Sequence, residues 1–184
     1  QGVDVITDLQ GNNLLAGNQG SDQLTGGNGN NVFIGGLTND SIVSGSGNDL
    51  FAFNALDGDD HIRLGGGEDT LSLGGGIRYE DLSLMRQGDS LRLNLGNGDT
   101  ITFDDWYTSP ANQSLVNLQV IADSLGDYDA SGTNVLKDNK VESFDFQALV
   151  AKFEEARAAN PRLNRWSMMN SMLGAHIEFI RSEE

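Results

Sequence analysis

The sequence predicts a mainly β fold in which a parallel β-roll is followed by a β-meander cap and a short α-helical C-terminal region. Three observations lead to this prediction. A nine-residue pattern repeats through residues 1–76, alternating apolar and polar residues mark short strands within residues 77–125, and apolar residues at helical spacing follow in residues 126–184. We expect the chain to be organised in three parts with these boundaries.

The roll is predicted from three columns of residues that keep the same nine-residue interval, with two extra residues before the last two repeats. The first column consists of Asp4, Asn13, Asp22, Asn31, Asp40, Asp49, Asp60 and Asp69. Two positions later stand Ile6, Leu15, Leu24, Phe33, Ile42, Phe51, Ile62 and Leu71. Two positions earlier stand Gly2, Gly11, Gly20, Gly29, Thr38, Gly47, Gly58 and Gly67. A flexible glycine-rich linker would not keep three columns in register, so the pattern indicates a folded repeat.

Each repeat can form a glycine-rich turn and a strand of about three residues whose middle, apolar side chain points inward. Two repeats then close one coil, and the turns alternate between two edges of a flattened roll. We call the edge with Asp4, Asp22, Asp40 and Asp60 the odd edge. The even edge carries Asn13, Asn31, Asp49 and Asp69.

Carboxylates stacked at the spacing of neighbouring strands repel one another, so such a ladder needs protons or cations at neutral pH. Calcium fits best, because it accepts six to eight oxygen ligands, including backbone carbonyls, in flexible geometry. One inward apolar side chain per repeat buries little area relative to the cost of ordering the backbone. We therefore expect calcium to supply folding free energy to the roll.

The overall charge agrees with a cation as partner. The chain has 27 Asp and Glu residues against 11 Lys and Arg, a formal net charge of −16. This excess disfavours nucleic acid and anionic membrane surfaces as partners. The chain has no cysteine, which excludes disulfides and thiolate metal sites. It begins at Gln1 without a methionine, and we expect it to be a fragment of a larger protein with upstream domains.

The repeats resemble the RTX family of haemolysin-type calcium-binding nonapeptides, G-G-x-G-x-D-x-U-x with U a large apolar residue. The best copies are residues 26–34 and 44–52. The resemblance implies that each calcium ion lies between successive turns of one edge, held by two Asp side chains and by turn carbonyls. The implied sites lie between Asp4 and Asp22, Asp22 and Asp40, Asp40 and Asp60, and Asp49 and Asp69. Further candidate ligands are Asn13, Asn31, Gly2, Gly20, Gly29, Gly47, Gly58 and Gly67. The pair Asp22 and Asp40 is our first choice.

The sequence departs from the family pattern at several positions. Asn13 and Asn31 replace aspartates, so we expect the even edge to bind calcium more weakly or to lose a site. Thr38 replaces a turn glycine. The extra residues near Leu56 and Asp57 are predicted to distort the last site of the odd edge.

The cap is predicted from three alternating segments, residues 82–85, 90–95 and 100–103, separated by glycine-containing turns. The following Asp-Asp-Trp-Tyr, residues 104–107, is similar to the region that trails RTX repeats in large secreted toxins and adhesins. The implied role is to cover the strand edges at the open end of the roll. We favour core packing for Trp106 and Tyr107 over an aromatic binding patch.

Two helices are predicted in the C-terminal region. In the first, Ser143 is the predicted N-cap and Asn160-Pro161 ends the helix. Its apolar face consists of Phe146, Leu149, Val150, Phe153 and Ala156. The face of the second helix consists of Trp166, Met169, Leu173, Ile177 and Ile180. We expect both faces to pack against the rest of the chain, and a partner-binding or membrane-active helix is the alternative.

Other signals are weaker. Residues 127–138 are similar to an EF-hand loop, but Asp138 stands where glutamate is expected, and we favour a simple turn. His61 and His176 are too far apart in sequence to suggest a zinc site. The chain has neither a G-x-S-x-G motif nor a thiol nucleophile, so we predict no enzymatic activity.

Taken together, the resemblance implies a calcium-binding module of a secreted or surface-attached bacterial protein of the toxin or adhesin type. It implies export by type I secretion, with folding outside the cell where calcium is abundant. The alternative is a carbohydrate- or cell-surface-binding accessory module of a secreted enzyme or adhesin. A carbohydrate-binding module would carry basic or aromatic residues along one face of the roll. Residues 1–76 offer only Arg63, Phe33, Phe51 and Phe53, which counts against this alternative, and the sequence gives no other support for glycan or membrane contact.

Overall fold

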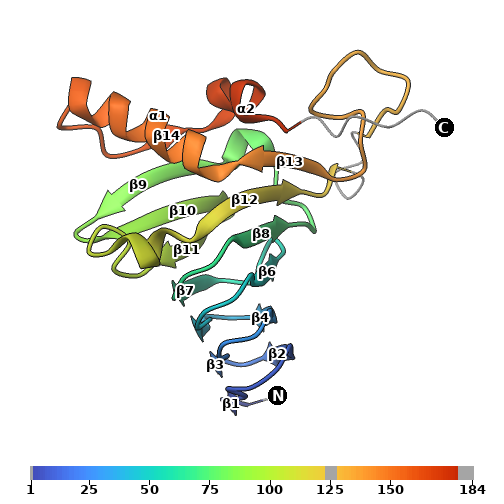
Figure 1. Cartoon of the computed structure of the whole chain (residues 1–184). Coiled ribbons are helices and arrows are strands. Elements are labelled where there is room, and N and C mark those ends of the chain that lie inside the picture. Colours follow the sequence, from blue (N-terminus) through green and yellow to red (C-terminus); the bar gives the residue numbers. More distant parts are fainter. Residues whose placement is uncertain (1, 123–127, 178–184) are drawn as a thin grey trace.

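The structure is a computed structural model that describes residues 2–122 and 128–177. A narrow roll carries the N-terminus, and a broader cap with both helices covers its other end (Figure 1). The predicted mainly β fold is confirmed, with the parallel roll, the β-meander and the short helical region in the expected order.

Two parallel columns of strands form the roll. One column contains β1 (Val5–Thr7), β3 (Gln23–Thr25), β5 (Ser41–Val43) and β7 (Asp59–Arg63). The other contains β2 (Leu14–Gln19), β4 (Val32–Leu37), β6 (Leu50–Phe53) and β8 (Asp69–Leu73). Leu24 pairs with Ile42 and Phe33 with Phe51, so one coil spans two repeats as predicted.

The apolar column of the sequence forms the centre of the roll. From Leu15 to Leu71 its members are at most 2% exposed, and Phe33 stacks on Phe51 with ring centroids 5.4 Å apart. Ile6 is only partly buried, because no described coil lies beyond the first one. The core continues from the roll into the cap without interruption.

Strands β2 and β4 are longer than the predicted three residues. They span six residues each, because part of the following turn also pairs with the next coil, as Asn18 does with Gly36. The repeat therefore builds two unequal columns, with the longer strands leading into the turns of the odd edge.

The cap extends both columns. The predicted meander is present as β9 (Ser83–Gln87), β10 (Ser90–Gly96) and β11 (Asp99–Phe103), which pair antiparallel. Strand β11 pairs in parallel with β7, and β12 (Leu115–Val120) pairs in parallel with β8. Both strand edges at the end of the roll are therefore covered, as expected for a cap. Short 3₁₀ helices lie at Tyr79–Asp81 and Pro110–Gln113.

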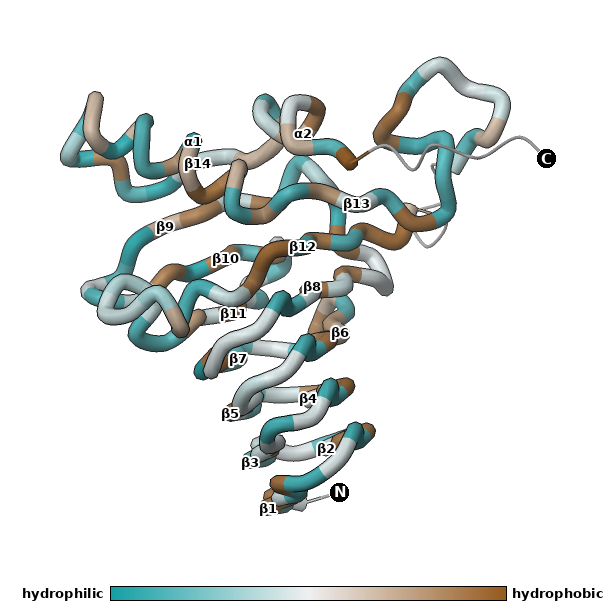
Figure 2. Tube along the Cα trace, in the orientation of Figure 1, coloured by the Kyte–Doolittle hydropathy of each residue, from teal (hydrophilic) through white to brown (hydrophobic). Residues whose placement is uncertain are grey.

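The interior of the cap is aromatic. Trp106 is 1% exposed and lies between Phe103 and Phe146, with ring centroids 5.7 and 6.0 Å away. This confirms core packing for Trp106. Figure 2 shows the same contrast, with strongly hydrophobic segments along β12 and mostly hydrophilic or neutral turns in the roll.

The first helix, α1 (Phe146–Ala159), buries the predicted residues Phe146, Leu149, Val150 and Phe153 and ends before Asn160. Ser143 is not its N-cap. It lies in β13 (Glu142–Asp145), which pairs with β12, and the helix starts only after this strand. Asp145 is the cap, and its side chain accepts a hydrogen bond from the Ala148 N–H at 2.9 Å.

The predicted face of the second helix is wrong. Trp166 lies in β14 (Trp166–Ser167), which pairs with β9, and the helix is only α2 (Met169–Ala175). Its buried residues are Met172 and Ala175, whereas Met169 and Leu173 are 42% and 63% exposed. The pairing of β14 fixes how the chain enters the helix and turns a different face inward. Ile180 lies outside the described residues. Neither described helix is both long and apolar enough to span a membrane.

Candidate metal centre

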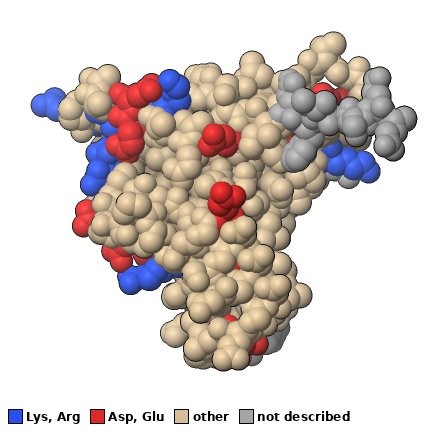
Figure 3. Space-filling view, viewed as in Figure 1, with Lys and Arg blue, Asp and Glu red and all other residues tan. Residues whose placement is uncertain are grey.

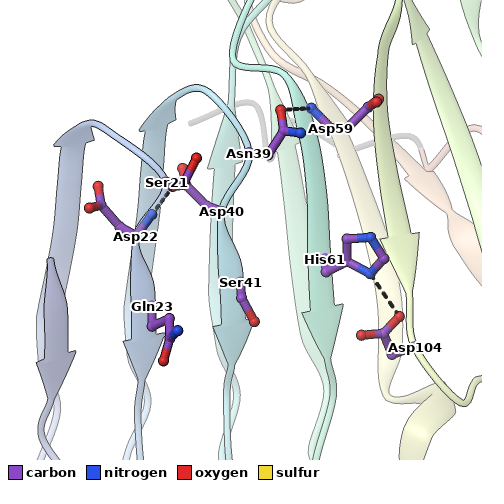
Figure 4. Close-up of a pocket in the computed structure, with 9 residues that line it drawn as sticks. All are labelled: Ser21, Asp22, Gln23, Asn39, Asp40, Ser41, Asp59, His61 and Asp104. Atoms are coloured by element: carbon purple, nitrogen blue, oxygen red, sulfur yellow. Dashed lines mark hydrogen bonds and ion pairs between the residues drawn. The ribbon is translucent and has the colours of Figure 1, made fainter. Parts of the chain in front are cut away.

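The aspartates of the odd edge form a ladder that runs along the roll. In Asp22, Asp40 and Asp60, Oδ1 accepts a hydrogen bond from the backbone N–H of the equivalent residue one coil earlier. The N···O distances are 2.7 Å from Asp4 to Asp22, 2.7 Å from Asp22 to Asp40 and 2.8 Å from Asp40 to Asp60. Figure 4 shows the bond between Asp22 and Asp40. The structure therefore brings together the four aspartates predicted for this edge.

The second carboxylate oxygen of these aspartates has no such bond. The Oδ2 atoms of Asp22, Asp40 and Asp60 are buried without a hydrogen-bond partner among the described residues, and each residue is at most 2% exposed. A buried, ionised oxygen without a partner is costly, and such atoms call for a proton or a bound ion. The ladder thus offers the free oxygen atoms that a cation site requires.

Turn glycines complete the oxygen lining. A Cβ atom on Gly17 would lie 2.3 Å from Asp22 Oδ2 and 2.6 Å from the Gly35 carbonyl oxygen. On Gly35 it would lie 2.3 Å from Asp40 Oδ2. Carboxylate and carbonyl oxygens therefore face one small space that only glycine leaves open, which is the donor set that calcium prefers. Gly17 and Gly35 were not among the predicted ligands, although the first glycine of the nonapeptide pattern pointed to them.

The predicted glycines lie in a different environment. A Cβ on Gly20 would lie 1.7 Å from the carbonyl oxygen of Gly2, and one on Gly29 would lie 1.8 Å from that of Gly11. Gly47 and Gly67 stack in the same way on the carbonyls of Gly29 and Gly47. Gly58 approaches Thr38, which adopts a left-handed φ of 81° although it replaces a glycine. Their visible role is close stacking of the coils.

The even edge has a similar ladder with a different outcome. Asn31 Oδ1 accepts from the Asn13 N–H at 3.0 Å, but Asn31 Nδ2 donates to the Gly29 carbonyl at 2.8 Å. A Cβ on Gly26 would lie 2.9 Å from this nitrogen, so the amide takes the place that Asp22 Oδ2 has on the odd edge. An amide N–H cannot ligate a cation. Hydrogen bonds alone satisfy this part of the even edge.

The cap closes the even ladder. Asp49 and Asp69 continue it, with 2.8 Å between the Asp49 nitrogen and Asp69 Oδ1. The hydroxyl of Ser114 donates to Asp69 Oδ2 at 2.6 Å, which satisfies the last carboxylate from the cap. Asp49 Oδ2 is the one aspartate oxygen of this edge that is buried without a partner among the described residues.

Other side-chain groups give no comparable site. Among the described residues, no group of three or more His, Asp or Glu side chains is arranged to hold a metal, so further ligands would have to be backbone carbonyls, neutral side-chain oxygens or water. Asp127 lies outside the described residues. Within the loop that follows, Asp129 Oδ1 accepts from the hydroxyl of Ser131 at 2.8 Å, as in a turn.

The surface around the ladder is polar. A groove of about 550 Å³ lies beside the odd edge, and in it His61 pairs with Asp104 at 3.0 Å. Figure 4 shows the residues that line this groove. The groove is lined by Ser21, Asp22, Gln23, Asn39, Asp40, Ser41, Asp59, His61 and Asp104. On the face shown in Figure 3, basic side chains lie over the cap side, and most of the roll surface is uncharged. Six of the ten acidic residues of the roll are buried: Asp22, Asp40, Asp49, Asp57, Asp60 and Asp69.

Burial raises the pKa of Asp40 to about 6 and that of Asp60 to about 8, and repulsion from the neighbouring aspartates adds to both shifts. The folded chain therefore retains protons that an unfolded chain has already lost between about pH 4 and pH 8. Without calcium, we expect the free energy of unfolding to be largest near pH 4 and to fall as the pH rises to 8. Urea unfolding in calcium-free buffers across this range would measure it. A stability that rises with pH would contradict the prediction.

A protein-family model matches the roll. The family model of the RTX calcium-binding nonapeptide repeat (4 copies) matches residues 1–33, 17–51 and 53–78. Among solved structures, the extracellular lipase LipA from Serratia marcescens is 31% identical, with a TM-score of 0.46, over 55% of this chain and 17% of the lipase chain. No curated protein matches the chain. The N-terminal roll therefore consists of RTX calcium-binding nonapeptide repeats, which bind calcium ions.

Proposed function

We propose that this chain is a calcium-responsive folding module of a secreted protein, with its principal calcium sites along the odd edge. The observation that carries the proposal is the row of buried aspartate oxygens that have no hydrogen-bond partner within residues 2–122 and 128–177, in repeats of a calcium-binding type. On the even edge, the pair Asp49 and Asp69 is the remaining candidate, because Asn31 is already satisfied by hydrogen bonds.

Each proposed site uses two successive coils. Asp22 and Asp40, with the carbonyl oxygen of Gly35, would hold the ion at the site whose oxygen lining is the most complete in the structure. The bound ion supplies positive charge that offsets the repulsion between stacked carboxylates. The chain contributes the rest: Oδ1 of each aspartate fixes the register of the coil before it, and the glycines allow the backbones to approach.

The same arrangement gives a reason for secretion through a type I system. At the low calcium concentration of a cytosol, charge repulsion keeps the roll from folding, and the chain remains suited to export as an unfolded polypeptide. Outside the cell, sites of this kind are filled at the calcium concentrations typical of extracellular modules, roughly 10⁻⁴ to 10⁻³ M. We propose an extracellular or cell-surface location on this ground, with any further activity residing in other domains of the parent protein.

Calorimetric titration with calcium tests the proposal. The Asp22→Asn variant is expected to lose one site or to bind there more than about tenfold more weakly, because its amide can donate to the turn carbonyl as Asn31 does. Asp89→Asn is the matched control, since its carboxylate lies in an exposed turn of the cap. Equal titration curves for Asp22→Asn and the unaltered chain would contradict the proposal.

A further inference from the structure

The last coil of the odd edge contains two extra residues, and this insertion places a carboxylate inside the molecule. Leu56 adopts a left-handed φ of 74°, which bends the chain there. Asp57 is consequently 5% exposed, and its Oδ2 accepts a hydrogen bond from the Asn54 N–H at 2.7 Å. A surface loop would leave such a charge in water, whereas this one buries it beside the ladder.

The cap adds another buried carboxylate at the same place. Asp99, at the start of β11, is 7% exposed, and its Oδ2 accepts from the Leu56 N–H at 2.5 Å. Burial is the largest cause that raises the pKa of Asp57, and the charge of Asp99 raises it further. Four buried aspartates therefore gather around the insertion: Asp40, Asp57, Asp60 and Asp99. None of them takes part in an ion pair of the described residues.

Two of these aspartates also point to a ligand. Asp40 Oδ2 and Asp60 Oδ2 are buried without a hydrogen-bond partner among the described residues. Asp57 precedes Asp60 by three residues in the same turn, and its charge is among the causes that raise the pKa of Asp40 and of Asp60. The insertion was predicted to distort this site, yet the rung is intact, with 2.8 Å between the Asp40 nitrogen and Asp60 Oδ1. Ile42 and Ile62 likewise remain in register. The longer coil thus keeps the hydrogen bond between Asp40 and Asp60 and places a further carboxylate beside this pair.

We propose that Asp57, brought inward by the insertion, makes the site between Asp40 and Asp60 the tightest calcium site of the roll. This inference rests on the proposed function. Asp57 acts through its charge and not as a ligand, because the described carboxylates do not converge as a ligand set of three. Asp99 supports it from the cap, so the cap contributes to the affinity of the neighbouring site as well as covering the strand edges.

Calcium titration of the full chain by calorimetry tests this inference. In Asp57→Asn, the tightest class of sites is expected to weaken roughly tenfold, because a buried negative charge near the ion is removed. Asparagine retains an oxygen that can accept from the Asn54 N–H, so the turn is kept. Asp89→Asn is the matched control, since its carboxylate lies in an exposed turn of the cap, away from the insertion. It is expected to change the tightest class much less.

A second variant and one comparison make the outcome decisive. Asp99→Asn is expected to weaken the same class, whereas Asp22→Asn is expected to affect a different one. Circular dichroism at saturating calcium checks that each variant folds. If Asp57→Asn does not fold, the titration of Asp99→Asn alone tests the inference. An unchanged tightest class in these variants overturns the inference and leaves the proposed function standing. If the unaltered chain takes up no calcium, the proposed function itself fails.

Discussion

In calcium-free buffer at neutral pH, the chain is expected to lose most of the β-sheet circular dichroism signal of its roll, and millimolar calcium is expected to restore it. The physical reason is the burial of Asp22, Asp40 and Asp60 with one oxygen of each unsatisfied. At neutral pH such a carboxylate is either ionised without a partner or holds a proton that it would lose in the unfolded chain. Both states destabilise the fold unless a cation is bound. One apolar side chain per repeat does not offset this cost and the loss of backbone entropy.

Far-ultraviolet circular dichroism in EDTA and in several millimolar calcium measures the change. Magnesium is the control ion, because its smaller, rigid octahedral shell is poorly served by backbone carbonyls, and it should restore less signal. The near-ultraviolet signal of the buried Trp106 reports whether the cap loses its packing together with the roll. An identical β-sheet signal in EDTA and in calcium would show that the roll does not depend on the ion.

Replacing Gly67 with alanine is expected to destabilise the calcium-loaded chain by roughly 3 kcal/mol or more. The added Cβ would lie 1.8 Å from the carbonyl oxygen of Gly47, and Gly67 has a left-handed φ of 110°. The clash is with backbone, which no side-chain movement can relieve. The two coils would have to separate, and the rung between Asp49 and Asp69 would be strained with them.

The neighbouring Gly66 provides the control. It also has a left-handed φ, 116°, but a Cβ there would have nothing within 4 Å. Alanine at Gly66 is therefore expected to cost only the backbone strain, about 1–2 kcal/mol. Urea unfolding of both variants at saturating calcium separates the stacking contribution from the strain. Equal losses of stability in the two variants would contradict the stacking interpretation of Gly67.

The roll could be predicted from sequence because each coil repeats the environment of the one before it. Inward positions such as Phe33 and Phe51 recur at a fixed interval, so local pattern and long-range contact carry the same information. The C-terminal region has no such repetition. Ser143 has the local sequence of a helix cap but lies in β13, which pairs with β12. Trp166 lies in β14, which pairs with β9. Those pairings join segments that are distant in sequence. A short helical pattern contains no information about such contacts.

The candidate site shows a similar division. The sequence identified the columns of aspartates and asparagines, and the structure places them in two ladders as expected. The sequence could not show that the Asn31 amide nitrogen faces the turn carbonyl, because residue type does not fix the orientation of a side chain. The roles of Gly17 and Asp57 depend on which carbonyls and carboxylates the coils bring together. Those contacts exist only in the folded chain.

The strands of the roll lie across its long direction, with the N-terminus at the narrow tip and the cap at the far end (Figure 1). A pulling force applied between the N-terminus and the cap would therefore load the hydrogen bonds of one coil at a time. Coils would detach successively from the tip, and strands would not slide past each other along their length. Resistance to such peeling would depend on the links between neighbouring coils, including the bond from the Asp4 N–H to Asp22 at the tip. The force needed to detach each coil would then depend on whether its proposed odd-edge site holds an ion.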